Sequence, residues 1–346
     1  MSPTLGIEDL SVTFTQRGAD IPAVRQVSLA VAPRECVGIV GESGSGKTQV
    51  FMAAMGLLAG NATAGGRVSF EGGDILQVPP AQLNRIRGSK LTMIFQDPMT
   101  SLTPHLKIGT QLAEVLVCHR GQPWSEARIA ARRMLERVRV PEPGRRLNQY
   151  PHELSGGLRQ RVMIGMSLLC DPRLVIADEP TTALDVTVQA QIIDLLRAMR
   201  EEVGMALVLI SHDLGVVAGL ADRILVMYAG RVVESAGAAE LFQQAQHPYT
   251  AELLKCIPNL SGPRLERLPT LAGQPPQAGD SFQGCAFAPR CPRVAERCRA
   301  ERPLLEEAGV ANTGGGARDN GDARDNGNAR DNGNAHRVAC HFPLPS

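Results

Sequence analysis

Four short apolar runs recur along the chain, and a glycine-rich loop follows the first while a polar residue follows each of the others. The runs are Cys36–Val40, Leu91–Phe95, Leu174–Ala177 and Ala206–Ile210. A run of this length and composition is typical of a strand buried on both faces, as in a parallel α/β sheet. Because ligands of such sheets bind at the carboxyl ends of the strands, we expect the residues after the runs to form one site.

Other segments have different patterns. Leu10–Phe14 alternates apolar and polar residues, Val24–Val31 does so less regularly, and Arg67–Phe70 predicts another short strand. Such alternation is typical of half-buried strands. Between the second and third apolar runs, Ser125 can cap a helix whose apolar positions recur at three- and four-residue intervals, at Ala127, Ala130, Met134 and Val138. We therefore expect a helical insertion over about residues 98–165.

A glycine-rich loop follows the first apolar run. It fits the pattern G-x-x-x-x-G-K-[ST] and consists of Gly41, Glu42, Ser43, Gly44, Ser45, Gly46, Lys47 and Thr48. Glycines let consecutive backbone N–H groups turn toward an anion, and the helix expected from Lys47 adds the positive end of its dipole. The loop is thus predicted to bind nucleotide phosphates, with Lys47 on the β- and γ-phosphates and Thr48 on Mg²⁺.

The ends of the other three runs supply the remaining chemistry of phosphoryl transfer. Asp178 is expected to hold Mg²⁺, and Glu179, directly after it, to act as the general base on a water molecule. We expect Gln96 to contact the Mg²⁺ or the attacking water, and His212 to contact the γ-phosphate. Phe14 lies upstream of the loop, where its ring could stack on adenine or simply pack in the core.

A second candidate anion site lies at the end of the helical insertion. Ser155, Gly156 and Gly157 precede a helical run and offer open backbone donors and a hydroxyl. A single compact domain gives no reason for two phosphate-binding elements per nucleotide. A dimer does, if each nucleotide is held between the loop of one chain and the Ser-Gly-Gly of the other. A small-molecule kinase with the same loop would leave the second element without a purpose.

Taken in order, the glycine loop, Gln96, Leu154–Gly157, Leu174–Glu179, Ala183–Asp185 and His212 resemble the ATP-binding subunit of an ABC transporter. The resemblance covers about residues 5–239. It implies an α/β ATPase domain over residues 1–240, with a parallel-sheet core, an antiparallel β subdomain and the helical insertion. It also implies that ATP contacts Asp185. Leu158 stands where the family signature usually has Gln.

A narrower resemblance concerns the cargo. Phe95–Leu102, Met227–Gly230 and His247–Thr250 look like the oligopeptide/dipeptide importer branch, in which related importers carry nickel or glutathione. It implies an ATPase that powers peptide import from the cytoplasmic face of the inner membrane. The implied partners are a second ATPase subunit, two membrane permease subunits and an extracytoplasmic substrate-binding protein. Residues 97–105 are expected to contact the permeases.

The main alternative is a soluble ABC mechanoenzyme acting on DNA or ribosomes. The single phosphate loop, the single signature and the lack of sustained heptads argue against it, and a net charge of +1 gives no reason to expect a nucleic-acid partner. The first ten residues include two acids and lack the apolar stretch of a signal peptide. No run reaches the ~18 apolar residues of a membrane helix, so membrane contact is expected to go through partners.

From Leu241 the composition shifts to Pro, Arg and Cys, which predicts a smaller second domain over residues 241–346. Inside it, a six-residue repeat from Ala317 to Asn334 has alternating charge and no apolar face, so we expect a disordered insertion at about residues 311–336.

Four of the eight cysteines cluster in this tail, namely Cys285, Cys291, Cys298 and Cys340. Without an export signal, disulfides are not expected, and the spacings are looser than the C-x₂-C pairs of most zinc sites. Four thiolates from irregular loops suit a structural [4Fe–4S] cluster, which the resemblance also implies. A zinc site and a tail without metal remain open.

Overall fold

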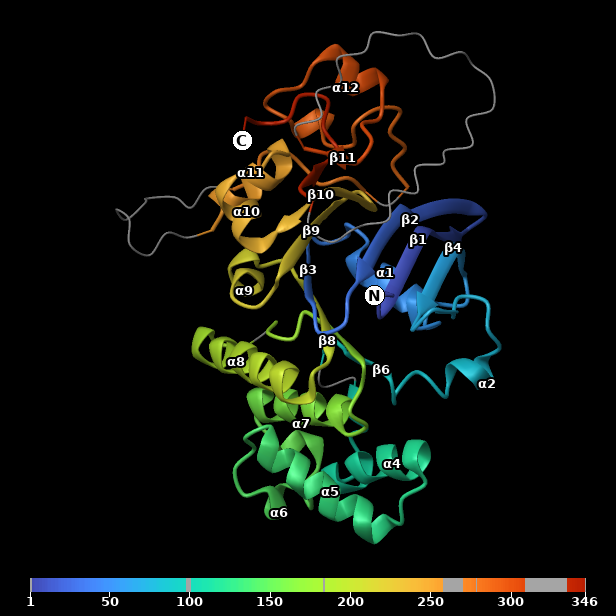
Figure 1. Cartoon of the computed structure of the whole chain (residues 1–346), viewed down its shortest axis with the longest axis vertical. Helices are drawn as coiled ribbons and strands as arrows, with labels where there is room; N and C mark the ends of the chain where they lie inside the picture. The colour runs from blue at the N-terminus through green and yellow to red at the C-terminus, as the bar shows by residue number, and fades with distance from the viewer. Residues whose placement is uncertain are drawn as a thin grey trace.

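The protein is described here from a computed structural model, which covers residues 2–97, 101–182, 184–257, 270–277, 279–308 and 335–345. The molecule is elongated, with a helical region at one end, the C-terminal tail at the other and the main sheet between them (Figure 1). Almost all of the expected insertion at 311–336 lies outside the described residues, and so do Pro98–Thr100 and Ala183.

The main sheet contains eight strands in the order β11-β12-β10-β9-β3-β8-β7-β6. Its inner strands are parallel, and β10 runs antiparallel to β9. The four apolar runs form β3, β6, β7 and β8, and every residue of β3, β7 and β8 is buried. The predicted parallel core is confirmed. The strand bounds are β3 Cys36–Val40, β6 Leu91–Ile94, β7 Leu174–Asp178, β8 Ala206–Ser211, β9 Arg223–Tyr228 and β10 Arg231–Gly237.

A second, antiparallel sheet has the order β2-β1-β4-β5. Its strands are β1 Leu5–Gln16, β2 Ala19–Val31, β4 Ala62–Phe70 and β5 Gly73–Asp74. Helix α1, Lys47–Ala54, packs against β1 and β2. Its Val50 and Phe51 share one buried core with Leu10 of this sheet and Ile39 of the main sheet. The helix that begins at the glycine loop is thereby fixed between the two sheets.

The helical region was expected between the second and third strand-forming runs, and it lies there. It contains α4 Ile108–Arg120, α5 Trp124–Arg137, α6 Pro143–Arg146 and α7 Gly156–Leu168, and α8, Val186–Val203, packs against α7. The predicted cap at Ser125 is wrong, because α5 begins at Trp124 with Pro123 as its N-cap. The apolar stripe is correct in outline, since Ala127, Met134 and Val138 are buried.

The C-terminal tail extends the main sheet rather than standing apart from it. The short strands β11, Glu306–Glu307, and β12, Arg337–Val338, join its edge beside β10. Helix α10, Ala238–Gln243, leads into the tail, which also contains α11 Pro248–Lys255 and α12 Glu296–Ala300. Phe287, from the tail, is 1% exposed and belongs to the larger core cluster of the ATPase region. Tail and sheet therefore share one core.

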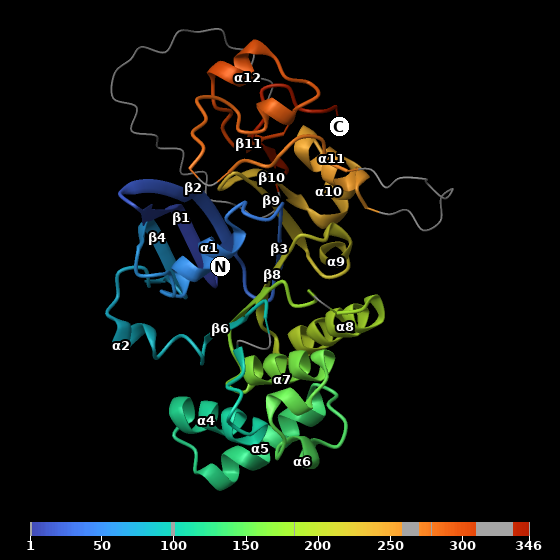
Figure 2. The same ribbon diagram turned by 180° about the vertical axis from the view of Figure 1, so that it is seen from behind.

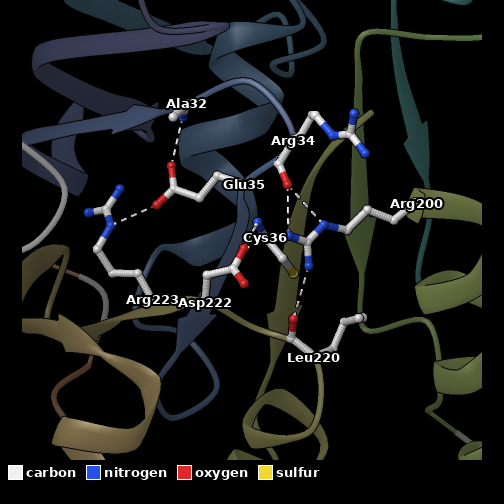
Figure 3. A network of polar contacts seen from close by, with 8 residues as sticks. All are labelled: Ala32, Arg34, Glu35, Cys36, Arg200, Leu220, Asp222 and Arg223. Atoms are coloured by element: carbon white, nitrogen blue, oxygen red, sulfur yellow. Dashed lines mark hydrogen bonds and ion pairs between the residues drawn. The ribbon is translucent and has the colours of Figure 1, made fainter. Parts of the chain in front are cut away.

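Polar contacts fix the amino end of β3, the strand that carries the glycine loop (Figure 3). Glu35 accepts a hydrogen bond from Arg223, whose side chain is 3% exposed. Arg200 of α8 donates to Asp222 at 2.6 Å, and Asp222 accepts from the backbone N–H of Cys36 at 2.7 Å. Burial raises the pKa of the Cys36 thiol to about 12, so this cysteine is an inert core residue.

No helix in the described part of the chain combines the length and the apolar character needed to cross a bilayer.

Candidate active site

The glycine loop joins β3 to α1, as the sequence predicts, and two of its glycines are fixed by close backbone contacts. Gly41 and Gly46 have φ values of 152° and 94°. A Cβ atom at Gly46 would lie 2.5 Å from the carbonyl oxygen of Ala23, and one at Gly41 would overlap that of Met227. Only glycine fits at both places, and the loop can then turn its N–H groups toward an anion.

Lys47 is the cation of this loop. It is 5% exposed, and its Nζ donates to the carbonyl oxygens of Gly41 at 2.7 Å and Glu42 at 2.9 Å. Burial lowers the pKa of Lys47, while the nearby carboxylates of Glu179, Asp178 and Glu42 oppose that shift. The third hydrogen bond of Lys47 Nζ, at 3.4 Å, goes to the Ser45 hydroxyl, and a buried ammonium whose hydrogen bonds all go to neutral oxygens is a strong attractor for phosphate oxygens.

Thr48 and Asp178 place two hard oxygen donors side by side. The Thr48 hydroxyl donates to Asp178 Oδ1 at 3.1 Å, which joins the first turn of α1 to the end of β7. Asp178 is 4% exposed, and burial raises its pKa, against the effect of the Thr48 hydrogen bond. A carboxylate beside a hydroxyl, both next to the phosphate loop, fits the oxygen ligation that Mg²⁺ prefers.

The structure brings three strand ends together around Glu179. Its Oε2 accepts from Gln96 Nε2 at 2.9 Å and from the Thr182 hydroxyl at 2.8 Å, while His212 Nδ1 lies 3.2 Å from Oε1. The Glu179 backbone is left-handed, with φ of 45°, which is uncommon for a residue other than glycine. Sequence reasoning missed Thr182, although its place three residues after Glu179 is typical of a turn contact.

The second candidate anion site lies elsewhere in the fold. Ser155 is the N-cap of α7, and its hydroxyl accepts from the N–H of Leu158. Helix α7 packs on α5, α8 and β6. In both views it lies toward the helical end, apart from α1 (Figure 2).

Asp185 caps α8 through a 2.9 Å hydrogen bond from Val188 N–H. Val188 lies next to Gly157, where an added Cβ would approach its side chain to 3.0 Å. Asp185 and the Ser-Gly-Gly element thus lie close to each other and apart from the glycine loop.

Two other expected site residues have different surroundings. Phe14 lies on β1, is partly buried and packs against the core that contains α1. Leu102, within the segment 97–105 expected to contact a partner, is 1% exposed and part of the larger core cluster. The expectation is wrong for Leu102, because a core side chain has no surface to offer.

Comparison with known proteins fits this arrangement. The ABC transporter family matches residues 24–182, and the oligopeptide/dipeptide transporter C-terminal region matches residues 233–298. The chain is 50% identical over 300 residues to the oligopeptide transport ATP-binding protein OppD of Salmonella typhimurium, which covers 87% of this chain and 89% of the relative. For OppD of Escherichia coli the identity is 49% over 302 residues, with the same coverage. The chain belongs to the oligopeptide branch of the ABC transporter ATP-binding proteins.

Solved structures agree with the family. The dimeric ATP-binding cassette MJ0796, in a post-hydrolysis state with ADP and phosphate, superposes with a TM-score of 0.62 at 29% identity and covers 68% of this chain and 98% of its own. The structure of cbiO1 from Clostridium perfringens, part of an ABC transporter complex, has a TM-score of 0.60 at 26% identity and covers 70% of this chain and 92% of its own. The chain is thus an ABC-type ATPase.

The family match in the tail includes three of the four clustered cysteines. All four, Cys285, Cys291, Cys298 and Cys340, line one small cavity with Phe287 and Pro303. Burial raises the pKa of the Cys285 and Cys291 thiols, and that of Cys340 to about 11. Among the described residues, however, no three His, Cys, Asp or Glu side chains form a group that could hold a metal ion.

Proposed function

We propose that this chain is the ATP-hydrolysing subunit of an ABC importer for peptides. The observation that carries the proposal is the contact set of Glu179, which Gln96, Thr182 and His212 hold beside the Thr48–Asp178 pair. A fixed carboxylate next to a phosphate loop and two oxygen ligands is what hydrolysis of a γ-phosphate requires. The peptide cargo rests on the relatives, which are named for oligopeptide transport.

Each site residue then has a role. The loop N–H groups and Lys47 bind the phosphates, and the side of the Phe14 ring that the core leaves exposed stacks on adenine. Thr48, Asp178 and Gln96 would hold Mg²⁺, which would supply positive charge to neutralise the phosphates. Glu179 accepts the proton of the attacking water, and Gln96 also orients that water. His212, whose side chain is 59% exposed, has room to turn from Glu179 toward the γ-phosphate.

We further propose that Ser155, Gly156, Gly157 and Asp185 act on the nucleotide of a second ATPase subunit. The position of α7 apart from α1 supports this, because the Ser-Gly-Gly donors then face a different nucleotide from the one in the chain's own loop. The similar structure of MJ0796 is a dimer. The complex would also contain two permease subunits and an extracytoplasmic binding protein, with this chain peripheral on the cytoplasmic face of the inner membrane.

For the tail we propose a [4Fe–4S] cluster on Cys285, Cys291, Cys298 and Cys340, with a structural role. Their shared cavity supports it, since the buried Cys298 of α12 and the partly buried Cys285, Cys291 and Cys340 of three loop segments all line it. A single zinc ion needs its thiolates about 2.3 Å from the metal, and therefore close to one another. A four-iron cluster is larger and accepts thiolates that lie farther apart, and the loose sequence spacings of the four cysteines are the reason we propose it rather than zinc.

The cargo assignment is tested on the complete complex reconstituted in vesicles. We expect ATP hydrolysis to rise when the binding protein is loaded with peptides, and not with nickel or glutathione. Glu179→Gln provides the control for hydrolysis by this site. Stimulation by nickel or glutathione but not by peptides would overturn the peptide assignment and leave the ATPase assignment standing.

A further inference from the structure

Glu42 puts a negative charge at the start of the loop that should bind a polyanion. Its side chain is 25% exposed, and it is one of the carboxylates that act on the Lys47 ammonium. An unpaired carboxylate here would repel the phosphates of ATP and compete for Lys47, because like charges in a partly buried site interact strongly. The loop therefore needs something to compensate Glu42.

That compensation comes from the tail. Arg290 donates through Nη1 to Glu42 Oε2 at 2.6 Å and through Nη2 to Oε1 at 3.0 Å, although 248 residues separate the two in sequence. The Arg290 side chain is 4% exposed. Its Nε also donates to the carbonyl oxygen of Ala272, and Nη1 lies 3.3 Å from the Tyr228 hydroxyl. A buried two-point pair of this kind is both strong and geometrically specific.

The tail also holds the backbone of Glu42. The Glu42 N–H donates to the hydroxyl of Tyr249, a fully buried residue of α11, at 2.9 Å. The Glu42 carbonyl oxygen accepts a hydrogen bond from Lys47 Nζ. The N–H, the carbonyl and the carboxylate of Glu42 thus all have partners, and the partners of the N–H and the carboxylate come from the tail. The rings of Tyr249, Tyr228 and Phe287 pack together with centroids 4.6 to 5.4 Å apart, which makes the support rigid.

We propose that Arg290 is a positioning residue of the ATP site, which neutralises Glu42 and fixes the start of the phosphate loop. The affinity for ATP then depends on a tail residue that does not touch the nucleotide. The inference rests on the proposed ATP site and extends it to the segment that carries the clustered cysteines, since Cys291 follows Arg290 directly.

The test is a double-mutant cycle on the full chain, read out as binding of a fluorescent ATP analogue. Arg290→Gln should weaken binding by about tenfold when Glu42 is present, because the carboxylate is left unpaired beside the phosphates. In the Glu42→Gln background the same change should alter binding by less than about twofold, because no charge remains to be neutralised. Arg290→Lys, which keeps the charge without the fork, should lose less than Arg290→Gln.

Arg297→Gln is the matched control, because it removes a tail arginine of α12 whose partner, Glu301, is the exposed C-cap residue of that helix. It should leave ATP binding unchanged, and thermal melting of every variant checks the fold. Equal losses from Arg290→Gln in both backgrounds would show a merely structural role and overturn the proposal, as would no loss in either. If the unsubstituted chain fails to bind ATP, the proposed ATPase function fails as well. This result distinguishes failure of the proposed function from failure of the role proposed for Arg290.

Discussion

Replacing Glu179 by glutamine is a sharp perturbation, because it removes the base and keeps its shape. The carboxylate accepts from Gln96 and Thr182 and lies 3.2 Å from His212 Nδ1. A glutamine amide can still accept from Gln96 and Thr182 through its oxygen, and its NH₂ group can donate to an unprotonated His212 nitrogen. Three contacts therefore survive, and what is lost is the group that takes a proton from water.

The expected loss of turnover follows from the loss of this base. A positioned general base contributes about 10²–10⁴-fold to turnover, which corresponds to ~2.7–5.5 kcal/mol of transition-state stabilisation. ATP binding should be retained, and slightly strengthened, because Glu179 is one of the negative charges close to Lys47. The variant should thus separate binding from hydrolysis.

The assay is single-turnover and steady-state ATP hydrolysis by the assembled complex, with binding of a fluorescent ATP analogue in parallel. The matched control is Glu201→Gln, which changes an exposed glutamate of α8 and should leave both readouts unchanged. Turnover within about tenfold of the parent protein would refute the assignment of Glu179 as the base. Loss of both ATP binding and turnover would show instead that Glu179 maintains the structure of the ATP site.

Three further predictions concern other parts of the chain. Ser155→Arg should spare ATP binding by the isolated subunit but block dimer closure and hydrolysis; lost monomer binding would instead place Ser155 in the chain's own site. Burial alone would lower the pKa of His336, but its hydrogen bonds to Glu234 and Glu240 raise it above the usual value. The protonated His336 then stabilises the fold fully below about pH 6.5, and this stabilisation is lost as the pH rises through the folded pKa. His336→Gln should therefore lower Tm more at pH 6 than at pH 9. Equal losses of Tm at the two pH values would contradict this. Cys291→Ser should remove about four iron and four sulfide per chain from brown, anaerobically purified protein, whereas stoichiometric zinc in colourless parent protein would overturn the cluster.

The parallel core could be predicted because its strands are buried on both faces. Such strands are apolar throughout, so Leu174–Ala177 and Ala206–Ile210 stand out without any knowledge of their neighbours. The antiparallel strands were less visible. Within β1, which runs from Leu5 to Gln16, the alternation of apolar and polar residues indicated only Leu10–Phe14. Irregularities in the pairing of β1 with β2 interrupt the period of two in the rest of the strand.

The site shows the same division. Lys47, Asp178, Glu179 and His212 follow a short apolar run or close a known loop pattern, so local sequence is enough to find them. Arg290 carries no such signal, since its partner Glu42 lies 248 residues away and only the folded tail brings them together. Leu102 was misplaced for a related reason, because burial against distant helices cannot be read from a segment of nine residues.

Uptake of a labelled peptide into vesicles is the most direct test of the central claim, that ATP hydrolysis at Glu179 drives peptide import. The vesicles would contain this chain with its second ATPase subunit, the permeases and the binding protein, with ATP on the side of the ATPases. We predict uptake that requires ATP and is lost in the Glu179→Gln variant, while the binding protein still binds the peptide. Uptake that persists at the parent rate in that variant would contradict the account.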